Sequence, residues 1–418
     1  MARLLTFLLV LALAVGRAAW AEPIPPAASE GKRYGDVRNA AYYQTSEVFL
    51  GRIAVAIVLP DSPGAVYTPY DVEQVVSAVQ GATEFWAEQV GYIGVHFTYE
   101  VESAVPCSRS FVTTSPRQAD AEWIGEVMGQ LGYPAPPGTD AAEIVYPYLN
   151  DLRTRLGTEW AVCFFIPKVP AFNATFVSYG RIGGPYWVVP AGSPGDGNRW
   201  ILGKALSHVI IHDMGHLFWA RNEYDDGEGA DPTPCNVRSG YFGIRNLNSW
   251  YYDYTCDFRV GHRLPCCMAD VDALAACGYT LAHMGLLDSD DDQIPDIVDT
   301  HPIVELDPVP DTITTIAPMI SGRAEELLLP NLAGNGTRNP IGFNSIEHVE
   351  YRIDQMVDSL GAELWLRADP PEGFGDTTSV GFNFVPDSIT AGRHWISVRA
   401  ANSAGNRSDE FGRKTIEV

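Results

Sequence analysis

Two histidines, His212 and His216, stand four residues apart in the stretch 207–224, which reads SHVIIHDMGHLFWARNEY. Residues four apart share one face of an α-helix, so both imidazoles can point at a single metal ion. Asp213, a carboxylate, directly follows the first histidine. A metal held by imidazoles beside a carboxylate is an arrangement that activates water for hydrolysis. The spacing therefore predicts a metal site with a neighbouring base.

The stretch that positions these side chains has the apolar spacing of a buried helix. Apolar residues recur at three- and four-residue steps: Leu202, Leu206, Val209, Ile210 and Leu217. His208 also lies four residues before His212, but residues eight apart are ~12 Å apart along a helix, so one ion cannot bind all three histidines. A buried helix whose histidines bind no metal is the alternative.

The segment resembles the zinc-binding motif of the metzincin clan of zinc metallopeptidases, H-E-x-x-H-x-x-G-x-x-H/D. The resemblance implies Zn²⁺ bound by His212 and His216, with Asp213 as the general base. Asp213 is one methylene shorter than the Glu of the motif. We expect this departure to weaken catalysis.

The third zinc ligand of the motif falls six residues after the second histidine, where this chain has Asn222. Trp219 occupies the glycine position of the motif, and Glu223 lies one residue beyond the template. An amide oxygen is a poor zinc ligand, whereas a carboxylate is a good one. The third ligand therefore stays open between Asn222 and Glu223.

Met268, in the run PCCMAD, lies downstream of the histidine stretch. It resembles the methionine turn below the metal site of metzincins, and a further helix is expected over 271–277. Methionine also fills gaps in any core, so this residue adds little by itself.

Residues 1–21 have the pattern of a secretory signal peptide: an early arginine, an apolar run and an Ala-Trp-Ala ending. We therefore expect a secreted, extracellular or periplasmic protein without a membrane span, since no second long apolar run follows. The signal contains two arginines and no acid, so the exported chain would carry 26 basic and 52 acidic residues, a net charge of −26. Such a charge excludes nucleic acid as a partner.

Seven cysteines in an exported chain favour up to three disulfides and one free thiol. Pairing cannot be read from spacing. We expect Cys107 to pair with Cys163, because each borders a strand-like run, and two more bridges among the cysteines between Cys235 and Cys277.

Strand-like and helical stretches alternate before the histidine helix. Strands are expected over 51–60, 92–101 and 160–167, and helices from 68, over 124–131 and over 141–156. This alternation predicts a mostly parallel twisted sheet covered by helices. Residues 176–189 read as two extended segments around Gly183 and Gly184, and metzincins have an antiparallel, substrate-binding edge strand in this region.

Residues 288–299, DSDDDQIPDIVD, match the spacing of an EF-hand calcium loop. The template ligands are Asp288, Asp290, Asp292, Ile294 through its carbonyl, Asp296 and Asp299. Gln293 replaces the usual glycine of the turn. The loop resembles the calcium repeats of dockerins and of thrombospondin type 3 linkers. A solvated acidic linker is the alternative.

Short alternating runs at 348–354, 362–368, 380–385 and 394–402 predict a C-terminal β-sandwich. The run GRHWISVRAANSAGN resembles bacterial immunoglobulin-like or fibronectin type III modules. The predicted organisation is a signal at 1–21, a lead-in at 22–45, a metzincin-like α/β (α+β) domain with a mixed twisted sheet and an active-site helix at 46–285, a calcium linker at 286–310, and an all-β sandwich at 311–418.

The sequence thus predicts an exported zinc metalloendopeptidase that hydrolyses extracellular protein or peptide substrates, weakened by Asp213 and Asn222, with Zn²⁺ and Ca²⁺ as cofactors. An inactive pseudo-peptidase that serves as a binding or adhesion protein is the main alternative. A calcium-dependent surface protein with an incidental histidine pair is a third. Substrate preference and oligomeric state are not determined by the sequence.

Overall fold

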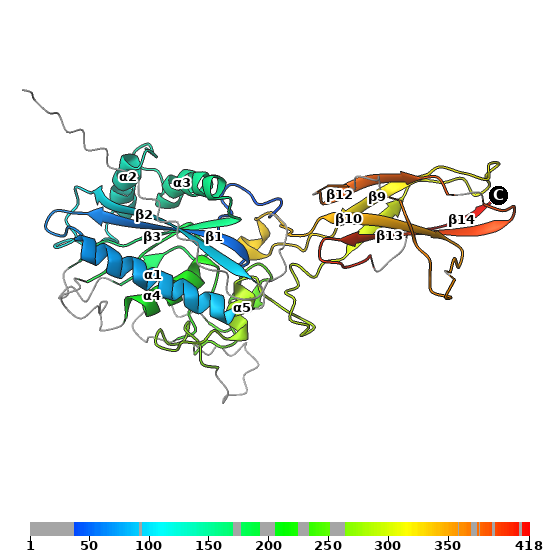
Figure 1. The fold of residues 1–418 in the computed structure, drawn as a ribbon. Helices are drawn as coiled ribbons and strands as arrows, with labels where there is room; N and C mark the ends of the chain where they lie inside the picture. The colour runs from blue at the N-terminus through cyan, green and yellow to red at the C-terminus, as the bar shows by residue number, and fades with distance from the viewer. Residues whose placement is uncertain are drawn as a thin grey trace, which may run out of the picture.

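The computed structural model describes residues 37–91, 94–169, 177–192, 205–224, 234–250, 264–357, 359–368, 374–375, 377–386, 389–408 and 412–418. The predicted signal peptide and most of the predicted lead-in lie outside these residues. A larger domain contains α1 to α5, and an elongated domain made of strands extends from one side of it (Figure 1).

The larger domain is built on a five-stranded sheet in the order β2-β1-β3-β5-β4. Its strands are β1 (Gly51–Asp61), β2 (Val95–Pro106), β3 (Trp160–Phe165), β4 (Tyr179–Gly180) and β5 (Tyr186–Val188). β1 runs parallel to β2 and β3, and β3 runs parallel to β5. β4 pairs antiparallel with β5 at the edge of the sheet. A mixed sheet forms where the sequence predicts one.

Helices cover both faces of this sheet. α1 (Pro69–Gln89) and α4 (Leu206–Leu217) lie on one face, and α2 (Asp120–Gln130) and α3 (Ala141–Leu156) lie on the other (Figure 1). α1 begins with a capping box, in which Thr68 and Asp71 satisfy each other's backbone N–H groups. The Trp86 indole of α1 donates to the Ile211 carbonyl of α4 over 3.0 Å. This contact fixes the two helices side by side.

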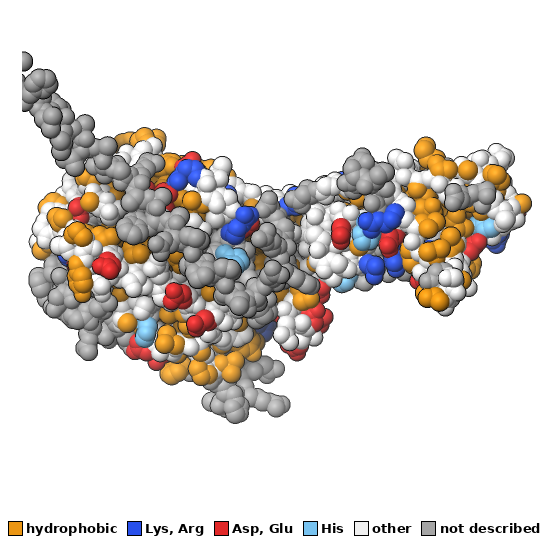
Figure 2. All heavy atoms as spheres, in the orientation of Figure 1, with side chains coloured by type: hydrophobic (Ala, Val, Ile, Leu, Met, Phe, Trp, Pro, Cys, Tyr) orange, Lys and Arg blue, Asp and Glu red, His pale blue; other side chains and the backbone are white. Residues whose placement is uncertain are grey.

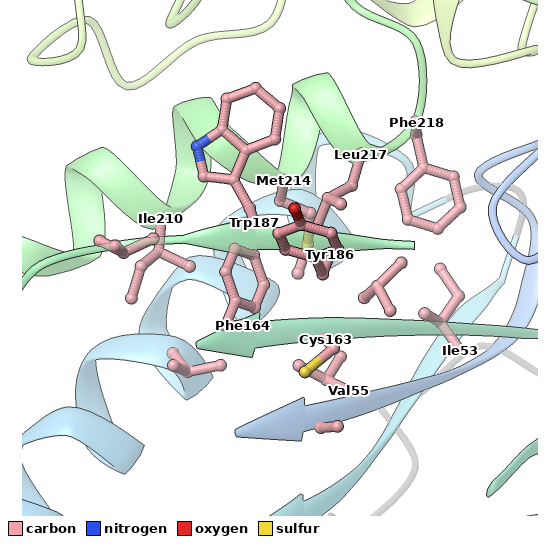
Figure 3. Packing of buried hydrophobic residues seen from close by; sticks show 14 of the residues in the cluster. Ile53, Val55, Cys163, Phe164, Tyr186, Trp187, Ile210, Met214, Leu217 and Phe218 are labelled. Carbon is pink, nitrogen blue, oxygen red and sulfur yellow. The ribbon is translucent and has the colours of Figure 1, made fainter. Parts of the chain in front are cut away.

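The apolar face of α4 packs onto the sheet. Figure 3 shows Ile210, Met214 and Leu217 of the helix beside Trp187 of β5, with Phe164 of β3 below. β1 is buried along nearly its whole length, as expected of a central strand covered on both faces. The histidine helix is therefore held by the main core.

The chain after α4 forms a short hairpin, β6 (Arg238–Ser239) with β7 (Ile244–Arg245), and the short helix α5 (Gly278–His283). The expected helix at 271–277 is wrong. Asp270 accepts the backbone N–H of Asp272 over 3.0 Å, and Cys267 N–H donates to the Ala275 carbonyl over 2.8 Å. These bonds form turns in place of helical hydrogen bonds, so the helix begins only at Gly278.

The second domain is a sandwich of two antiparallel sheets, ordered β11-β10-β13-β14 and β12-β9-β8. Its strands are β8 (Pro302–Leu306), β9 (Ile320–Glu326), β10 (Ile346–Ile353), β11 (Leu366–Arg367), β12 (Ser379–Phe384), β13 (Arg393–Asn402) and β14 (Gly412–Glu417). The 3₁₀ helix η3 (Ala333–Gly336) lies in the connection between β9 and β10. Residues from both sheets share one core. Tyr351 stacks on Phe384 across it, with ring centroids 3.9 Å apart. The described chain is thus a mixed α/β domain followed by a β-sandwich.

The junction between the domains differs from the expected boundaries. β8 falls inside the predicted 286–310 linker but is a strand of the sandwich. The stretch 329–344 returns to the larger domain, where Ile341 and Phe343 join the first core. Arg338 forms an ion pair with the fully buried Glu47. Sequence runs alone do not reveal such a return, because it depends on contacts between segments about 290 residues apart.

The expected disulfide between Cys107 and Cys163 is wrong, and the cysteines from Cys235 to Cys277 can form one of their two expected bridges but not both. Cys107 and Cys163 are buried free thiols. Cys163 lies on β3 and Cys107 directly follows β2, and β1 separates these strands. Two strand spacings are about 9.5 Å, beyond the Cα separation that a disulfide spans. Cys266, Cys267 and Cys277 are also free, whereas Cys235 is disulfide-bonded. Cys256 lies outside the described residues.

Within the described chain, no helix combines the length and apolarity needed to cross a membrane. Figure 2 shows basic, acidic and histidine side chains gathered in one patch on the sandwich domain. The sandwich domain contains an interleaved network, in which Arg399 pairs with Glu350 and packs 3.9 Å from the Trp365 ring centroid. Alternating signs keep that patch from presenting one strong charge.

Candidate functional site

The end of α4 turns the chain back over its own histidines. Ala220 N–H donates to the Gly215 carbonyl over 2.9 Å, and Trp219 N–H donates to the His216 carbonyl over 3.1 Å. This is the Schellman pattern of helix termination, which requires a left-handed residue at its turn. Trp219 holds that place with φ of 74°. The turn delivers Asn222 to the histidine pair.

Trp219 thus adopts the backbone conformation that the glycine of the motif would supply. A left-handed non-glycine residue costs ~1–2 kcal/mol. Packing compensates, since the indole lies against Gly183, where any added Cβ would sit 2.1 Å from the ring. The Arg338 guanidinium also lies over the indole, 5.0 Å from its ring centroid. The tertiary structure therefore supports a tryptophan where local preference favours glycine.

His212, His216 and Asn222 form a compact group, which we call the histidine cluster. The Nε2 atoms of the two histidines are 3.1 Å apart, and Asn222 Oδ1 is 3.0 Å from His212 Nε2. Both imidazoles are almost fully buried, with 5 % and 2 % exposure. The structure therefore brings three of the predicted ligands together.

Backbone carbonyls fix the orientation of both imidazoles. His212 Nδ1 is 2.8 Å from the Cys267 carbonyl, and His216 Nδ1 is 2.8 Å from the Ala220 carbonyl. A carbonyl only accepts, so each Nδ1 must carry the hydrogen. Each neutral ring then presents a lone pair at Nε2. The two lone pairs face each other, which is unfavourable unless a cation or proton lies between them.

Burial disfavours the proton. It lowers the pKa of His212, and it lowers the pKa of His216 to about 3, with a further contribution from the charge that His212 would carry. Ligand atoms at tetrahedral zinc, each 2.0–2.1 Å from the ion, lie roughly 3.3 Å apart. The separations of 3.0 and 3.1 Å approach that value. The residues of this cluster fit a divalent cation.

Asn222, and not Glu223, faces the histidines. The Glu223 carboxylate lies in a different group, where it accepts from Asn248 Nδ2 over 2.6 Å and from Thr280 Oγ1 over 3.1 Å. Burial raises the pKa of Glu223 to about 8. Of the two candidates for the third ligand, only Asn222 is in place.

Asp213, the predicted base, is fully buried on the side of α4 that faces the edge of the sheet. Its Oδ1 accepts from the Ser178 hydroxyl over 3.1 Å, directly before β4. Its Oδ2 is buried, and its neighbour is the buried Trp187 indole, which lowers the pKa of Asp213 by less than burial raises it. Burial raises the pKa of Asp213 well above its usual range. A cation nearby would favour the ionised form again.

Met268 packs against the histidine helix at Gly215. It is fully buried, and a Cβ added to Gly215 would meet its sulfur at 2.7 Å. Gly215 stands between the two histidines in the sequence, so the glycine lets the methionine approach the helix closely. The Met268 carbonyl also accepts the Glu223 N–H over 2.9 Å. Met268 therefore helps to position the returning chain.

Sequence reasoning missed several neighbours of the cluster. The Trp187 ring stacks on His216 with centroids 4.8 Å apart, and the Tyr224 ring lies 5.8 Å from that of His212. Both residues belong to stretches that the sequence linked to the site: Trp187 to the expected edge segment 176–189, and Tyr224 to the N-E-Y ending. The carbonyls of Cys267 and Ala220 leave no signal in a sequence, because every residue has a carbonyl.

The predicted calcium loop brings three of its carboxylates together. Ligand oxygens of Asp288, Asp290 and Asp292 lie within 4.8 Å of one another. Gln293, at the glycine position of the template, has φ of 72°, so the turn keeps the left-handed conformation. The pKa of Asp290 is raised, by desolvation and then by the neighbouring carboxylates. Asp290 and Asp292 are exposed.

The other predicted ligands of this loop have different partners. Asp296 accepts from the backbone and hydroxyl of Ser289, and Asp299 accepts from Asn406 Nδ2 of the sandwich over 2.7 Å. The Ile294 N–H donates to Asp292 Oδ1 over 2.7 Å, a bond that does not involve the carbonyl predicted as the ligand. The loop as it stands holds a partial set of converging oxygens.

Comparisons with known proteins add little to this geometry. No family model matches the sequence, and the curated proteins contain no match. Wild-type OgpA from Akkermansia muciniphila aligns over 95 % of this chain and 97 % of that chain, with 10 % identity and a TM-score of 0.24. Fibronectin(III)-like modules of CbhA from Clostridium thermocellum align with 15 % identity and a TM-score of 0.17. The alignment covers 28 % of this chain and 47 % of that chain.

A superoxide reductase (neelaredoxin) from Ignicoccus hospitalis aligns over 28 % of this chain and 81 % of that chain, with 16 % identity and a TM-score of 0.17. Likenesses at these TM-scores carry no argument about fold or activity. The functional inference therefore rests on side-chain geometry.

Proposed function

We propose that this chain is an exported zinc metallopeptidase-like protein that acts on extended peptides at the histidine cluster. The observation that carries the proposal is the pair of buried Nε2 atoms, 3.1 Å apart, whose rings are both fixed by carbonyls at Nδ1. Bound there, Zn²⁺ would supply a Lewis acid for the scissile carbonyl and the attacking water. His212, His216 and Asn222 would hold it.

The neutral amide of Asn222 suits a weak site. An Asn can present its oxygen to a cation, or turn its NH₂ toward an imidazole when no cation is bound. An Asp at this position would have no such alternative and would add a negative charge to the ligand set. Asn222 therefore lowers the affinity of the cluster for a cation relative to the motif residue.

Asp213 would move the proton of the attacking water in the proposed reaction. Its carboxylate is held toward the sheet edge by Ser178, immediately before β4. Proton transfer requires a heavy-atom distance of about 2.6–3.2 Å. Aspartate withdraws the carboxylate by one C–C bond, and misplacement by ~1 Å can cost on the order of a hundredfold in rate. We expect weak native activity.

The edge strand β4 would bind the substrate backbone. β4 pairs with β5 alone among the described strands and ends the sheet. A free edge can add an extended peptide as a further strand. Because Ser178 precedes β4 and contacts Asp213, a peptide on this edge would pass beside the proposed base. Phe176, the start of the predicted edge segment, lies outside the described residues.

The test compares wild type with Asp213→Glu, Asn222→Asp and the double variant. We expect the double variant to bind zinc more tightly and to hydrolyse a quenched unstructured peptide faster, with either single change doing less. Zinc titration and the peptide assay measure the two effects. Asp151→Glu on the exposed side of α3 is the matched control. Strong wild-type turnover that falls in Asp213→Glu would contradict the proposed geometry.

The inactive binding protein is the second candidate, and the Asp213 environment favours it. One oxygen is already bound by Ser178, and burial favours the protonated acid. A protonated carboxyl cannot accept the proton of water. Four equally inactive variants that still bind zinc would support this candidate.

Calcium would stabilise the junction in either case. Asp288, Asp290 and Asp292 converge at the start of the loop, and Asp299 at its end is bound to Asn406 of the sandwich. An ion at the converging oxygens would hold the loop between the two domains. We therefore propose a structural role for Ca²⁺, separate from the histidine cluster.

A further inference from the structure

A second group of metal-ligating side chains lies beside the histidine cluster and has no part in the proposed hydrolysis. It consists of Glu223, Cys266 and Cys277, whose ligand atoms lie within 4.8 Å of one another. Their exposures are 0 %, 1 % and 4 %. Two sulfurs and a carboxylate are donors that zinc accepts, and sulfur donors select thiophilic ions over calcium or magnesium.

The Glu223 carboxylate is buried without a compensating side-chain cation in its described surroundings. Its hydrogen-bond partners are the Asn248 amide at 2.6 Å, the Thr280 hydroxyl at 3.1 Å and the Cys277 thiol at 3.1 Å. Buried carboxylates are normally paired with a cation or coordinate a metal. A metal ion would supply the missing positive charge.

Both sulfurs are approached by hydrogen-bond donors. Cys277 N–H points at Cys266 Sγ over 3.4 Å, and Thr280 N–H points at Cys277 Sγ over 3.4 Å. The Thr280 hydroxyl is 3.1 Å from both Cys266 Sγ and Glu223 Oε1. Because the Thr280 hydroxyl donates to the carboxylate, the Cys266 thiol must donate to the Thr280 oxygen. The contacts are therefore satisfied only while both thiols are protonated, and a cation is needed once the sulfurs are thiolates.

Glu223 distinguishes a metal site from a disulfide. A bond between Cys266 and Cys277 would satisfy the sulfurs but would remove the thiol that donates to the carboxylate. The carboxylate would then be buried with one fewer donor, at a cost of about 1–3 kcal/mol. A metal ion satisfies all three side chains together.

We propose that Glu223, Cys266 and Cys277 form a closed, structural site for a thiophilic divalent cation such as Zn²⁺, with the Thr280 hydroxyl as a neutral neighbour. The site would clamp the two segments that shape the histidine cluster. Glu223 adjoins Asn222, and Cys266 adjoins Cys267, whose carbonyl orients His212. The proposal does not require that the histidine cluster hydrolyse peptides.

Cobalt titration of the full-length exported chain, purified without reductant and then stripped of metal, tests this site. Thiolate ligands give Co²⁺ an intense near-ultraviolet charge-transfer absorption, which the sulfur-free histidine cluster cannot give. We expect this absorption in wild type and in the His212→Ala, His216→Ala double variant. We expect its loss in Cys277→Ser and its weakening in Glu223→Gln. Cys163→Ser, a buried free cysteine of β3, is the matched control.

A second measurement covers the case in which Cys277→Ser does not fold. Alkylation of native wild-type thiols with and without Zn²⁺ should show Cys266 and Cys277 protected by the ion. A Cys266–Cys277 disulfide found by mass spectrometry would overturn the proposal. Absence of the absorption in folded, reduced wild type would overturn it as well. Either result leaves the histidine cluster to be judged by its own variants.

Discussion

The histidine cluster and the aspartate loop at 288–299 are both candidate metal sites, but they prepare their ligands in opposite ways. The imidazoles are buried and locked by the Cys267 and Ala220 carbonyls. The loop carboxylates are partly or fully exposed. Water can solvate exposed carboxylates, whereas it cannot enter between two buried lone pairs 3.1 Å apart. The buried cluster thus depends more strongly on an ion.

The two sites also differ in rigidity: the histidine cluster is held in place, whereas the loop side chains can change partners. Each imidazole is held by its helix, its carbonyl and a stacked or tilted ring. In the loop, Asp296 binds Ser289, and Asp299 binds the sandwich. Ion binding in the loop would require these two side chains to exchange partners. We therefore expect a preorganised zinc site and a calcium site that forms with the ion.

The largest expected effect is the loss of zinc when both histidines are removed. His212→Ala with His216→Ala should lower zinc content by about one ion per chain, because two of three ligands disappear. Metal analysis of the purified protein measures this. His208→Ala is the control, since His208 faces Asp272 on the surface at 3.1 Å. Undiminished zinc in the double variant would contradict the assignment.

Calcium should have the next largest effect, confined to the loop. An ion that binds only the folded state adds ~2.7 kcal/mol to the free energy of unfolding at a hundredfold excess over Kd. We expect Ca²⁺ to raise the melting temperature of wild type and to slow proteolysis at 286–310. Asp290→Asn with Asp292→Asn should abolish the response, and Glu347→Gln on the sandwich should keep it. An unchanged response in the loop variant would identify another calcium site.

A smaller effect should distinguish two glycines in helix interiors. Gly215→Ala places a methyl 2.7 Å from the Met268 sulfur, whereas Gly81→Ala in α1 meets nothing within 4 Å. Alanine favours a helix by ~0.8–1 kcal/mol, but overpacking costs ~1–3 kcal/mol. Chemical denaturation should show Gly81→Ala stabilised and Gly215→Ala destabilised, with zinc affinity lowered only in the latter. Equal stabilisation of both would show that Met268 does not restrain the helix.

The smallest effect concerns the pair of His394 and Asp354 in the sandwich, whose side chains are 2.7 Å apart. Asp354 raises the pKa of His394 above its ordinary value of 6.5. The stability that this pair adds is therefore complete below pH 6.5 and is lost as pH rises through the raised pKa.

Because the Asp354 side chain is 46 % exposed, the contribution should be only about 0.2–1 kcal/mol. Melting curves of wild type and His394→Gln at several pH values should converge above the raised pKa and separate below it. Parallel curves at every pH would show that the ion pair contributes nothing. Solvent reaches the Asp354 side of this pair, so we expect its electrostatic contribution to be smaller than that of an ion in the buried histidine cluster.

The sequence by itself determined the elements whose cause is local. Neighbouring residues alone determine the β-branched run of β1, the capping box of α1 and the four-residue spacing of the histidines. They gave the mixed sheet, its covering helices and a pair of imidazoles on one helix face. The alternating C-terminal runs likewise predicted a sandwich.

Tertiary structure decided what depends on distant segments. It placed β1 between the strands of Cys107 and Cys163, so the expected bridge cannot form. It directs the Glu223 side chain toward two cysteines, whereas the Asn222 side chain contacts the histidine pair. It also let Trp219 replace glycine, because Gly183 and Arg338 supply a packing surface from elsewhere in the chain. Spacing identifies which side chains share a helix face, but only packing between segments decides which of them meet.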